Sequence, residues 1–355
     1  MLQSAHGGNI DEICRLSGVN PDTMVDFSSN VSPFVPEKLI RGLIRASINT
    51  IGRYPDRENL ELRRVIAKRL GVPIECTVVG NGAADLIYRA VFTLRPQKGL
   101  IVAPTFSEYA KALHYAGAKV DFFTTDLRNK FQVSLDELIR QIKEHDTVFL
   151  CNPNNPTGQT VGKIELRAMI QEFSRKKITL LLDESFIDWC EENSMYSEAA
   201  SNGRILVIRS MTKFYGLAGL RLGYAVADKR TTRRISACGQ PWPVNGIAQT
   251  VGAGLLRNRE IMLESREQLI KERDYLYRRL CRNMKLQPYP TQANFIFIRI
   301  KGLSSTELTH ALMKKGIWVR DCSNFRGLDR QWIRIAVRKR KENMRLIKTL
   351  EKVLA

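Results

Sequence analysis

The stretch 205–227, ILVIRSMTKFYGLAGLRLGYAVA, consists of two apolar runs, ILVIRS (205–210) and LGYAVA (222–227), joined by a loop. The loop contains hydroxyl residues, several glycines, one lysine, Lys213, and an arginine eight residues later, Arg221. Short runs of Ile, Leu and Val bounded by glycine and polar residues are typical of buried strands. The stretch therefore predicts two strands, the first of which ends where the polar loop begins.

Similar apolar runs precede this stretch: TVVG (77–80), LIVA (100–103), KVDFFT (119–124), TVFLC (147–151) and ITLLLD (178–183). Between them, apolar residues with helical spacing predict helices at about 83–94, 107–116, 134–145 and 163–176. The third helix opens with Ser134 three residues before Glu137, a capping-box pattern. Strands that alternate with helices predict an α/β fold with a mostly parallel sheet, which binds ligands at the carboxyl ends of its strands.

After Trp242 the pattern changes. Helical stretches at about 245–257 and 260–283 are followed by strands near 295–300, 317–320 and 332–337. We interpret this part as a smaller α/β domain. The N-terminal segment is assigned to it, because Pro33 and Pro36 separate that segment from the helix that follows. The predicted division is a large domain at 40–250 and a small domain made of 1–39 and 251–355.

The composition is that of an ordinary globular protein, since 44% of the 355 residues are hydrophobic and 26% are charged. The sequence does not start with a basic segment followed by a long apolar one, and no apolar run approaches the ~20 residues that span a bilayer. The seven cysteines stand singly, as is usual for reduced thiols. We therefore expect a cytoplasmic protein with no membrane partner.

The formal net charge of +20 is typical either of a nucleic-acid binder or of a protein that handles small anions. Lys and Arg are spread along most of the chain, and the densest cluster, 338–341, opens a segment with helical spacing. We expect small anionic ligands and no nucleic acid; the alternative is a regulatory DNA-binding protein, which steeply salt-dependent DNA binding would support. The four histidines lack metal-ligand spacing, so no metal is expected.

The residues at two strand ends indicate the chemistry. Lys213 follows a strand, with the hydroxyls of Ser210 and Thr212 and the guanidinium of Arg221 nearby, which suits a covalent link to a carbonyl cofactor beside a phosphate. Asp183 ends the apolar run ITLLLD, where a carboxylate is costly to bury without a cation. A protonated pyridine nitrogen would supply that cation. These residues predict pyridoxal 5′-phosphate (PLP) as the cofactor.

Three further loops follow predicted strands. NPNNPTG (152–158) is an ordinary turn sequence, but an asparagine amide there would also reach a ring hydroxyl. GNGAA (80–84) opens a helix, and free N–H groups at a helix N-terminus suit a phosphate. APTFSEY (103–109) would place Phe106 on a cofactor ring, although an aromatic residue after proline is commonly part of the core. Each loop alone is a weak indication of a cofactor site. Together they are a strong one, because all of them follow strands of one predicted sheet.

Over nearly the whole chain these residues resemble PLP enzymes of fold type I, the aspartate-aminotransferase fold. The resemblance implies that Lys213 carries the cofactor, that Asp183 and Asn155 contact the ring nitrogen and ring hydroxyl, and that Phe106 stacks on the ring. It implies a phosphate site built from two loops: Ala83, Ala84, Ser210, Thr212 and Arg221. It also implies that Tyr54, in the motif RYPD (53–56), reaches the cofactor of a partner subunit, and thus a homodimer with shared active sites.

Within this fold the sequence is most similar to threonine-phosphate decarboxylases, which are themselves similar to histidinol-phosphate aminotransferases. The motif AHGGN (5–9) looks like the start of the decarboxylases and implies that His6 and Gly7 bind an anion; a lone histidine near a terminus is otherwise usually just exposed. DFSSNVSP (26–33) implies that Asn30 contacts the substrate, although it also suits a polar turn. Phe186 stands where the aminotransferases usually have tyrosine.

Two arginines suit an anionic substrate. Arg320 in VRDCS and Arg334 in WIRIAV lie on neighbouring predicted strands. A phosphomonoester carries a charge of about −1.5 to −2, and guanidinium groups bind such oxygens through paired hydrogen bonds. We expect both arginines, together with Asn155, to bind a phosphorylated amino acid. The sequence leaves open which arginine binds phosphate and which binds carboxylate, and surface ion pairs are the alternative for either.

The resemblance implies decarboxylation of O-phospho-L-threonine to (R)-1-aminopropan-2-yl phosphate, a precursor of the cobalamin nucleotide loop. An aminotransferase of the histidinol-phosphate type, which would require 2-oxoglutarate, is the alternative. A decarboxylase must hold the Cα–carboxylate bond out of the cofactor plane, and Lys213 would return a proton to Cα. Serine phosphate is not separated from threonine phosphate, because one methyl group is worth only ~1–3 kcal/mol.

Overall fold

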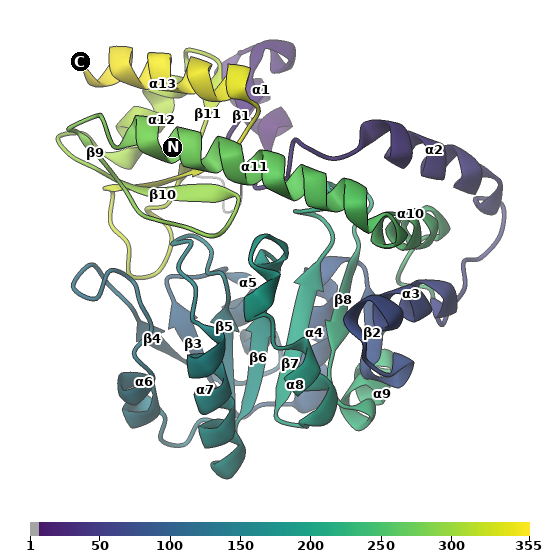
Figure 1. The fold of residues 1–355 in the computed structure, drawn as a ribbon. Helices are drawn as coiled ribbons and strands as arrows, with labels where there is room; N and C mark the ends of the chain where they lie inside the picture. Colours follow the sequence, from purple (N-terminus) through teal and green to yellow (C-terminus); the bar gives the residue numbers. More distant parts are fainter. Residues whose placement is uncertain (1–6) are drawn as a thin grey trace.

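A seven-stranded sheet forms the base of the molecule in the computed structural model, which describes residues 7–355 (Figure 1). Its strands are β2 (Thr77–Gly80), β3 (Lys98–Ala103), β4 (Lys119–Thr124), β5 (Thr147–Cys151), β6 (Thr179–Asp183), β7 (Ile205–Ser210) and β8 (Gly223–Val226). They lie in the order β2-β8-β7-β6-β5-β3-β4, and only β8 runs antiparallel to its neighbours. The predicted α/β fold with a mostly parallel sheet is confirmed.

Helices cover both faces of this sheet. They include α3 (Leu60–Leu70), α4 (Gly82–Leu94), α5 (Glu108–Tyr115), α6 (Leu135–Gln141), α7 (Lys163–Arg175), α8 (Tyr196–Ser201) and α9 (Lys229–Ala237). Successive residues of a strand therefore enter two different cores: Val207 packs in one and Ile208 in the other. Burial on both faces explains why these strands are apolar runs without polar alternation.

The helix predicted at 134–145 is shorter in the structure. Ser134 caps it by accepting a hydrogen bond from the backbone N–H of Glu137, as expected. The helix ends at Gln141, because Ile142 adopts an extended backbone (φ −72°, ψ 107°) and its side chain is buried. Burial of this apolar residue therefore overrides the helical spacing of the sequence.

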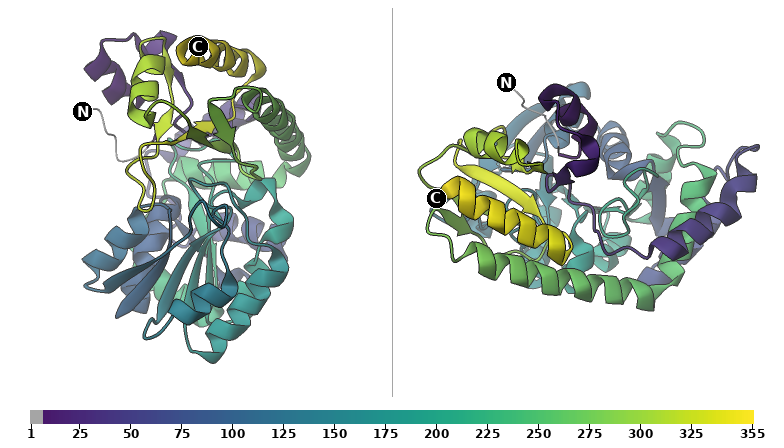
Figure 2. Two further views of the ribbon diagram at one scale, coloured as in Figure 1. Left: turned by 90° about the vertical axis from the view of Figure 1, so that its left-hand side faces the viewer. Right: turned by 90° about the horizontal axis from the view of Figure 1, so that it is seen from above.

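A second sheet lies above the first, in the order β12-β13-β10-β9. Its strands are β9 (Leu286–Pro288), β10 (Phe295–Ile300), β12 (Arg320–Asp321) and β13 (Trp332–Ala336). Figure 2 shows α12 (Ser305–Met313) and α13 (Arg340–Leu354) on the side of this sheet that faces away from the large sheet. The long helix α11 (Arg259–Leu280) runs along the same layer and follows α10 (Gly246–Arg257).

The N-terminal segment packs against this second layer. It contains α1 (Ile10–Ser17), a 3-10 turn (Pro21–Thr23) and β1 (Val25–Asp26). β1 pairs in parallel with β11 (Ile317–Trp318), and Phe27 is fully buried in the core of the second layer. The single strand predicted at 317–320 is therefore two strands, because β11 pairs with β1 whereas β12 pairs with β13.

The remaining helical segments are short or connect the layers: α2 (Glu37–Ser47) and 3-10 turns at Ile48–Thr50, Ile74–Cys76, Ile187–Trp189 and Glu191–Asn193. α2 begins directly after Pro36 and contacts α10. β1 thus joins the N-terminal segment to the second layer through β11, while the division into a large domain at 40–250 and a small domain of 1–39 and 251–355 stays a prediction. Within residues 7–355, every helix is too short or too polar to cross a bilayer.

Candidate active site

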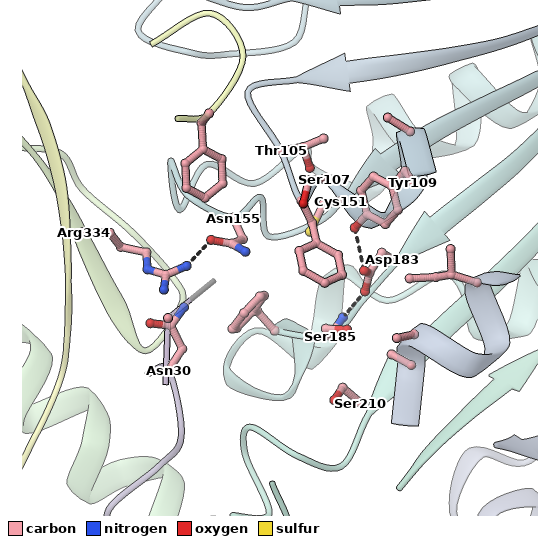
Figure 3. Close-up of a pocket in the computed structure, with 18 of the residues that line it drawn as sticks. Asn30, Thr105, Ser107, Tyr109, Cys151, Asn155, Asp183, Ser185, Ser210 and Arg334 are labelled. Carbon is pink, nitrogen blue, oxygen red and sulfur yellow. Dashed lines mark hydrogen bonds between the residues drawn. The ribbon is translucent and has the colours of Figure 1, made fainter. Parts of the chain in front are cut away.

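A cavity of about 570 Å³ lies at the carboxyl ends of the large sheet, beneath the second sheet (Figure 3). Thirteen of the residues predicted for cofactor or substrate line it: Gly7, Asn30, Ala83, Ala84, Phe106, Asn155, Asp183, Ser210, Thr212, Lys213, Arg221, Arg320 and Arg334. Of the other two, Tyr54 lies away from the cavity: it is 77% exposed and stacked on Trp242 with ring centroids 4.4 Å apart. His6 lies outside the described residues.

Lys213 sits in the loop after β7, where its side chain is half-buried and borders the cavity. Burial, and the nearby positive charges of Arg334 and Arg221, lower the pKa of Lys213 to about 8. The neutral amine is the form that attacks a carbonyl carbon. At neutral pH this lysine is therefore far easier to deprotonate than an exposed lysine, as a covalent attachment point requires.

Asp183 is buried at the end of β6, with 6% of its surface exposed. Its Oδ2 accepts a 2.6 Å hydrogen bond from the hydroxyl of Tyr109, and its Oδ1 accepts one of 2.9 Å from the backbone N–H of Ser185 (Figure 3). Burial raises the pKa of Asp183 in spite of these bonds. A cation placed against this carboxylate would offset the free-energy cost of burying its negative charge. A protonated pyridine nitrogen has the right charge for this.

The backbone comes unusually close to itself at the start of α4. A Cβ on Gly223 would lie 2.7 Å from the backbone nitrogen of Ala83, and a Cβ on Gly82, whose φ is +82°, would lie 2.8 Å from Nη2 of Arg221. Glycine is therefore required at both positions. Ala83 and Ala84 belong to the first turn of α4, where backbone N–H groups lack intrahelical acceptors, so this end of the cavity suits a phosphate.

Hydroxyl groups complete the same end of the cavity. Ser210 Oγ and Thr212 Oγ1 lie 2.7 Å apart, and both side chains are buried. The guanidinium of Arg221 adds a positive charge beside them. A helix N-terminus, two hydroxyls and an arginine can all donate hydrogen bonds to the oxygens of a phosphate.

The residues present fit PLP at three points. Lys213 offers an amine, Asp183 a buried carboxylate, and the first turn of α4 a phosphate site, all around one cavity. Phe106 and Asn155 also line the cavity.

Arg320 and Arg334 face each other across β12 and β13 as register partners, and 7% and 5% of their surfaces are exposed. Nη2 of Arg334 donates to the carbonyl oxygen of Ser28 at 2.7 Å, and its Nη1 donates to Oδ1 of Asn155 (Figure 3). Burial, together with the charge of Arg320, lowers the pKa of Arg334 to about 10. Two buried guanidinium groups of like charge make this end of the cavity strongly attractive for anions.

Phe186 also lines the cavity and is buried, with its ring 5.1 Å from that of Phe295 in an edge-to-face contact. A phenyl ring here offers no hydroxyl to a cofactor oxygen. Phe186, which stands where the aminotransferases usually have tyrosine, thus lies inside the cavity.

Two residues of the site were missed by sequence reasoning. The loop sequence APTFSEY does not reveal that Tyr109 belongs to the site, whereas in the structure Tyr109 lies in the first turn of α5 with its ring 5.8 Å from that of Phe106. Ser28 was quoted within the segment 26–33, but its link to Arg334 joins residues 306 positions apart. Only the tertiary structure reveals such a contact.

A fold type I PLP enzyme is the class of protein that such a site, at the carboxyl ends of this sheet, defines. The chain belongs to the class I and II aminotransferase family, whose model matches residues 22–350. It is 34% identical to the threonine-phosphate decarboxylase of Salmonella typhimurium over 357 residues, which is 100% of this chain and 98% of that protein.

Two solved structures are similar throughout. The histidinol-phosphate aminotransferase of Clostridium acetobutylicum has 29% identity and a TM-score of 0.86, over 92% of this chain and 98% of the other. The L-threonine-O-3-phosphate decarboxylase of Porphyromonas gingivalis has 26% identity and a TM-score of 0.83, over the same shares of the two chains. The fold is therefore shared by a decarboxylase and an aminotransferase, and the site has to distinguish them.

Proposed function

We propose that this protein is a PLP-dependent decarboxylase that converts O-phospho-L-threonine to (R)-1-aminopropan-2-yl phosphate, for the cobalamin pathway to which its sequence resemblance points. The observation that carries the proposal is the buried pair of Arg320 and Arg334 above Lys213. Two cations in one cavity suit a substrate with two anionic groups. The similarity to the Salmonella typhimurium decarboxylase along the full chain supports the same reaction.

We assign the substrate carboxylate to Arg334 and the phosphate to Arg320. Arg334 contacts Asn155, and its charge acts on Lys213, so it lies nearer to the reacting carbon. The carboxylate is bonded to that same carbon, whereas the phosphate is further out along the side chain. Arg320 donates to Asn324 at 2.7 Å and lies over the ring of Phe325, both on the loop that follows β12.

The chemistry that bound PLP supplies is a protonated ring able to accept the electron pair left when carbon dioxide departs. The chain's contribution is orientation. Arg334 and Asn155 fix the carboxylate, and Arg320 fixes the phosphate, so the substrate is held at both ends. When PLP is bound, this orientation would present the Cα–carboxylate bond, rather than the Cα–H bond, to the electron-accepting ring. Lys213, with a pKa of about 8, then has a proton to donate to Cα.

We further propose a cytoplasmic homodimer. Three large side chains are exposed: Ile51 (68%), Tyr54 (77%) and Trp242 (41%). Ile51 and Tyr54 are three residues apart in the sequence, and Tyr54 stacks on Trp242. A second copy of the chain would cover them and would bring Tyr54 to the cofactor of the partner. The seven cysteines are all free thiols, which suits a reducing compartment.

The test is to incubate the PLP-loaded protein with O-phospho-L-threonine, with and without 2-oxoglutarate, and to measure carbon dioxide, aminopropanol phosphate and glutamate. We expect carbon dioxide and aminopropanol phosphate in equal amounts without the keto acid. If no carbon dioxide is released, and glutamate forms from histidinol phosphate and 2-oxoglutarate, the protein is an aminotransferase instead.

A further inference from the structure

Ser28 joins three parts of the molecule around the cavity. It follows β1, its side chain is fully buried, and it lines the cavity. Its hydroxyl donates to Oδ1 of Asp26 at 2.7 Å and accepts from the backbone N–H of Gly8 at 3.0 Å. Its carbonyl oxygen accepts from Nη2 of Arg334 at 2.7 Å. One residue thus contacts both the N-terminal segment and an arginine of the second sheet.

Asp26 fixes the direction of the serine hydroxyl. Its Oδ1 accepts from the backbone N–H of Ser28 at 2.7 Å and from that of Ser29 at 3.3 Å, in addition to the hydroxyl. The hydroxyl proton is therefore directed to a carboxylate, which leaves the oxygen lone pairs for the N–H of Gly8. The bond between Ser28 and Gly8 depends on this arrangement.

The residues 7–9, which we call the N-terminal arm, lie directly against Ser28. A Cβ on Gly7 would lie 2.3 Å from the carbonyl oxygen of Ser28, so only glycine allows the approach. Gly8 has a φ of +85°, a conformation that glycine adopts without strain. Gly7 also lines the cavity. Gly7 thus forms part of the cavity wall, and the arm is bonded to a buried hydroxyl.

We propose that Ser28 is a positioning residue, whose hydroxyl fixes the N-terminal arm and whose carbonyl holds Arg334, both at the end of the cavity that we assign to the substrate carboxylate. This inference rests on the proposed function. Because the hydroxyl and the carbonyl belong to one buried residue, the arm and the arginine are set at a fixed spacing. This arrangement keeps Arg334 and the arm in position to bind the substrate carboxylate.

The experiment compares Ser28→Ala with Ser32→Ala in the full-length, PLP-loaded enzyme. Ser32 is a matched control, because it is buried in the same segment and its hydroxyl also accepts one backbone N–H, that of Phe34 at 3.3 Å. Ser28→Ala should raise KM for O-phospho-L-threonine about tenfold, the effect of one buried hydrogen bond, with kcat within about twofold. Ser32→Ala should leave both constants unchanged.

Two further measurements separate positioning from general damage. L-threonine, which has the carboxylate but lacks the phosphate, should lose affinity about as much as its phosphate does, with a KI about tenfold higher in Ser28→Ala than in wild type. Backbone amide exchange of residues 7–9 should be about tenfold faster in Ser28→Ala than in Ser32→Ala. Gly7→Ala, which would push a Cβ against the carbonyl oxygen of Ser28 and displace the arm, should reproduce the rise in KM.

An unchanged KM in Ser28→Ala, or a rise in KM with no change in the KI of L-threonine, would overturn this role of Ser28. The experiment distinguishes an error in the role of Ser28 from an error in the proposed function. If the wild-type enzyme releases no carbon dioxide from O-phospho-L-threonine, the proposed function is wrong. If it does, and Ser28→Ala behaves as Ser32→Ala, only the role of Ser28 is wrong.

Discussion

The hydroxyl of Tyr109, in α5, donates a 2.6 Å hydrogen bond to Oδ2 of Asp183, at the end of β6. The tyrosine is itself held firmly, because it is 1% exposed and its ring stacks on that of Phe149 with centroids 5.5 Å apart. Burial raises the pKa of Asp183, whereas the bonds from Ser185 and Tyr109 lower it. Tyr109 therefore helps to keep the carboxylate ionised and aimed into the cavity.

Tyr109→Phe removes this bond without altering the ring. We expect the pKa of Asp183 to rise further and the affinity for PLP to fall by about 10- to 100-fold, since hydrogen bonds to charged groups are worth ~1.5–3 kcal/mol. The measurement is an absorbance titration of the cofactor-free protein with PLP. Tyr115→Phe, at a 68% exposed tyrosine of the same helix, is the control and should bind PLP as wild type does. Equal affinities in all three proteins would show that Tyr109 has no such role.

The pKa of Lys213 predicts how cofactor uptake depends on pH. The lysine must be neutral to react, and burial lowers its pKa to about 8. Below about pH 8 the neutral fraction falls tenfold per pH unit, so the rate of PLP uptake should rise with pH and level off above about 8. Stopped-flow absorbance of the cofactor-free protein measures this profile.

Two variants test whether this pH profile comes from Lys213. Lys213→Ala should show neither the yellow absorption band of the lysine-bound cofactor nor any turnover. Lys111→Ala removes another lysine that lines the cavity, one that pairs with Glu108 at 2.7 Å, and should keep the wild-type profile. An active, yellow Lys213→Ala protein would contradict the proposed mechanism.

The two arginines should differ in which ligand they bind. Arg334→Gln should weaken both O-phospho-L-threonine and L-threonine, because each has a carboxylate, whereas Arg320→Gln should weaken only the phosphate. We expect each loss to be about 10- to 100-fold in KM or KI. Arg299→Gln is the control, since Arg299 in β10 bonds to Gln331 and does not line the cavity. If Arg320→Gln weakens L-threonine as much as its phosphate, the two assignments must be exchanged.

Much of the site could be predicted because it lies at the ends of strands. Lys213, Asp183 and Asn155 each follow an apolar run, and the carboxyl ends of parallel strands meet at one edge of a sheet. Sequence order alone thus brings these residues together. The pairing of Arg320 with Arg334 was also within reach, because the two strands are neighbours in the sequence.

Contacts between distant segments were beyond prediction. The bond from Arg334 to Asn155 spans 179 residues and depends on how the second sheet lies on the first. The split of 317–320 into two strands depends on β1, a two-residue strand with no periodicity to reveal it. The hydroxyl of Tyr109 finds Asp183 only because α5 packs on the sheet, which its helical pattern does not specify.

Tyr54 is the predicted residue that a single chain leaves without a role, since it points to solvent beside Trp242. If it completes the active site of the partner, a hybrid of two defective chains should regain activity. Tyr54→Ala has an intact Lys213 but gives its partner no tyrosine, and Lys213→Ala gives its partner an intact Tyr54 while lacking its own lysine. In a hybrid dimer, the site on the Tyr54→Ala chain therefore has both groups.

Random reassociation of equal amounts of the two variants yields hybrids in about half of the dimers, each with one complete site of two. The mixture should therefore reach about a quarter of wild-type activity on O-phospho-L-threonine, well above either variant alone. Activity is followed as carbon dioxide release after denaturation and joint refolding, with separately refolded variants as the control. A mixture no more active than the mean of its two components would mean that Tyr54 acts within its own chain or not at all, and that the active sites are not shared through this residue.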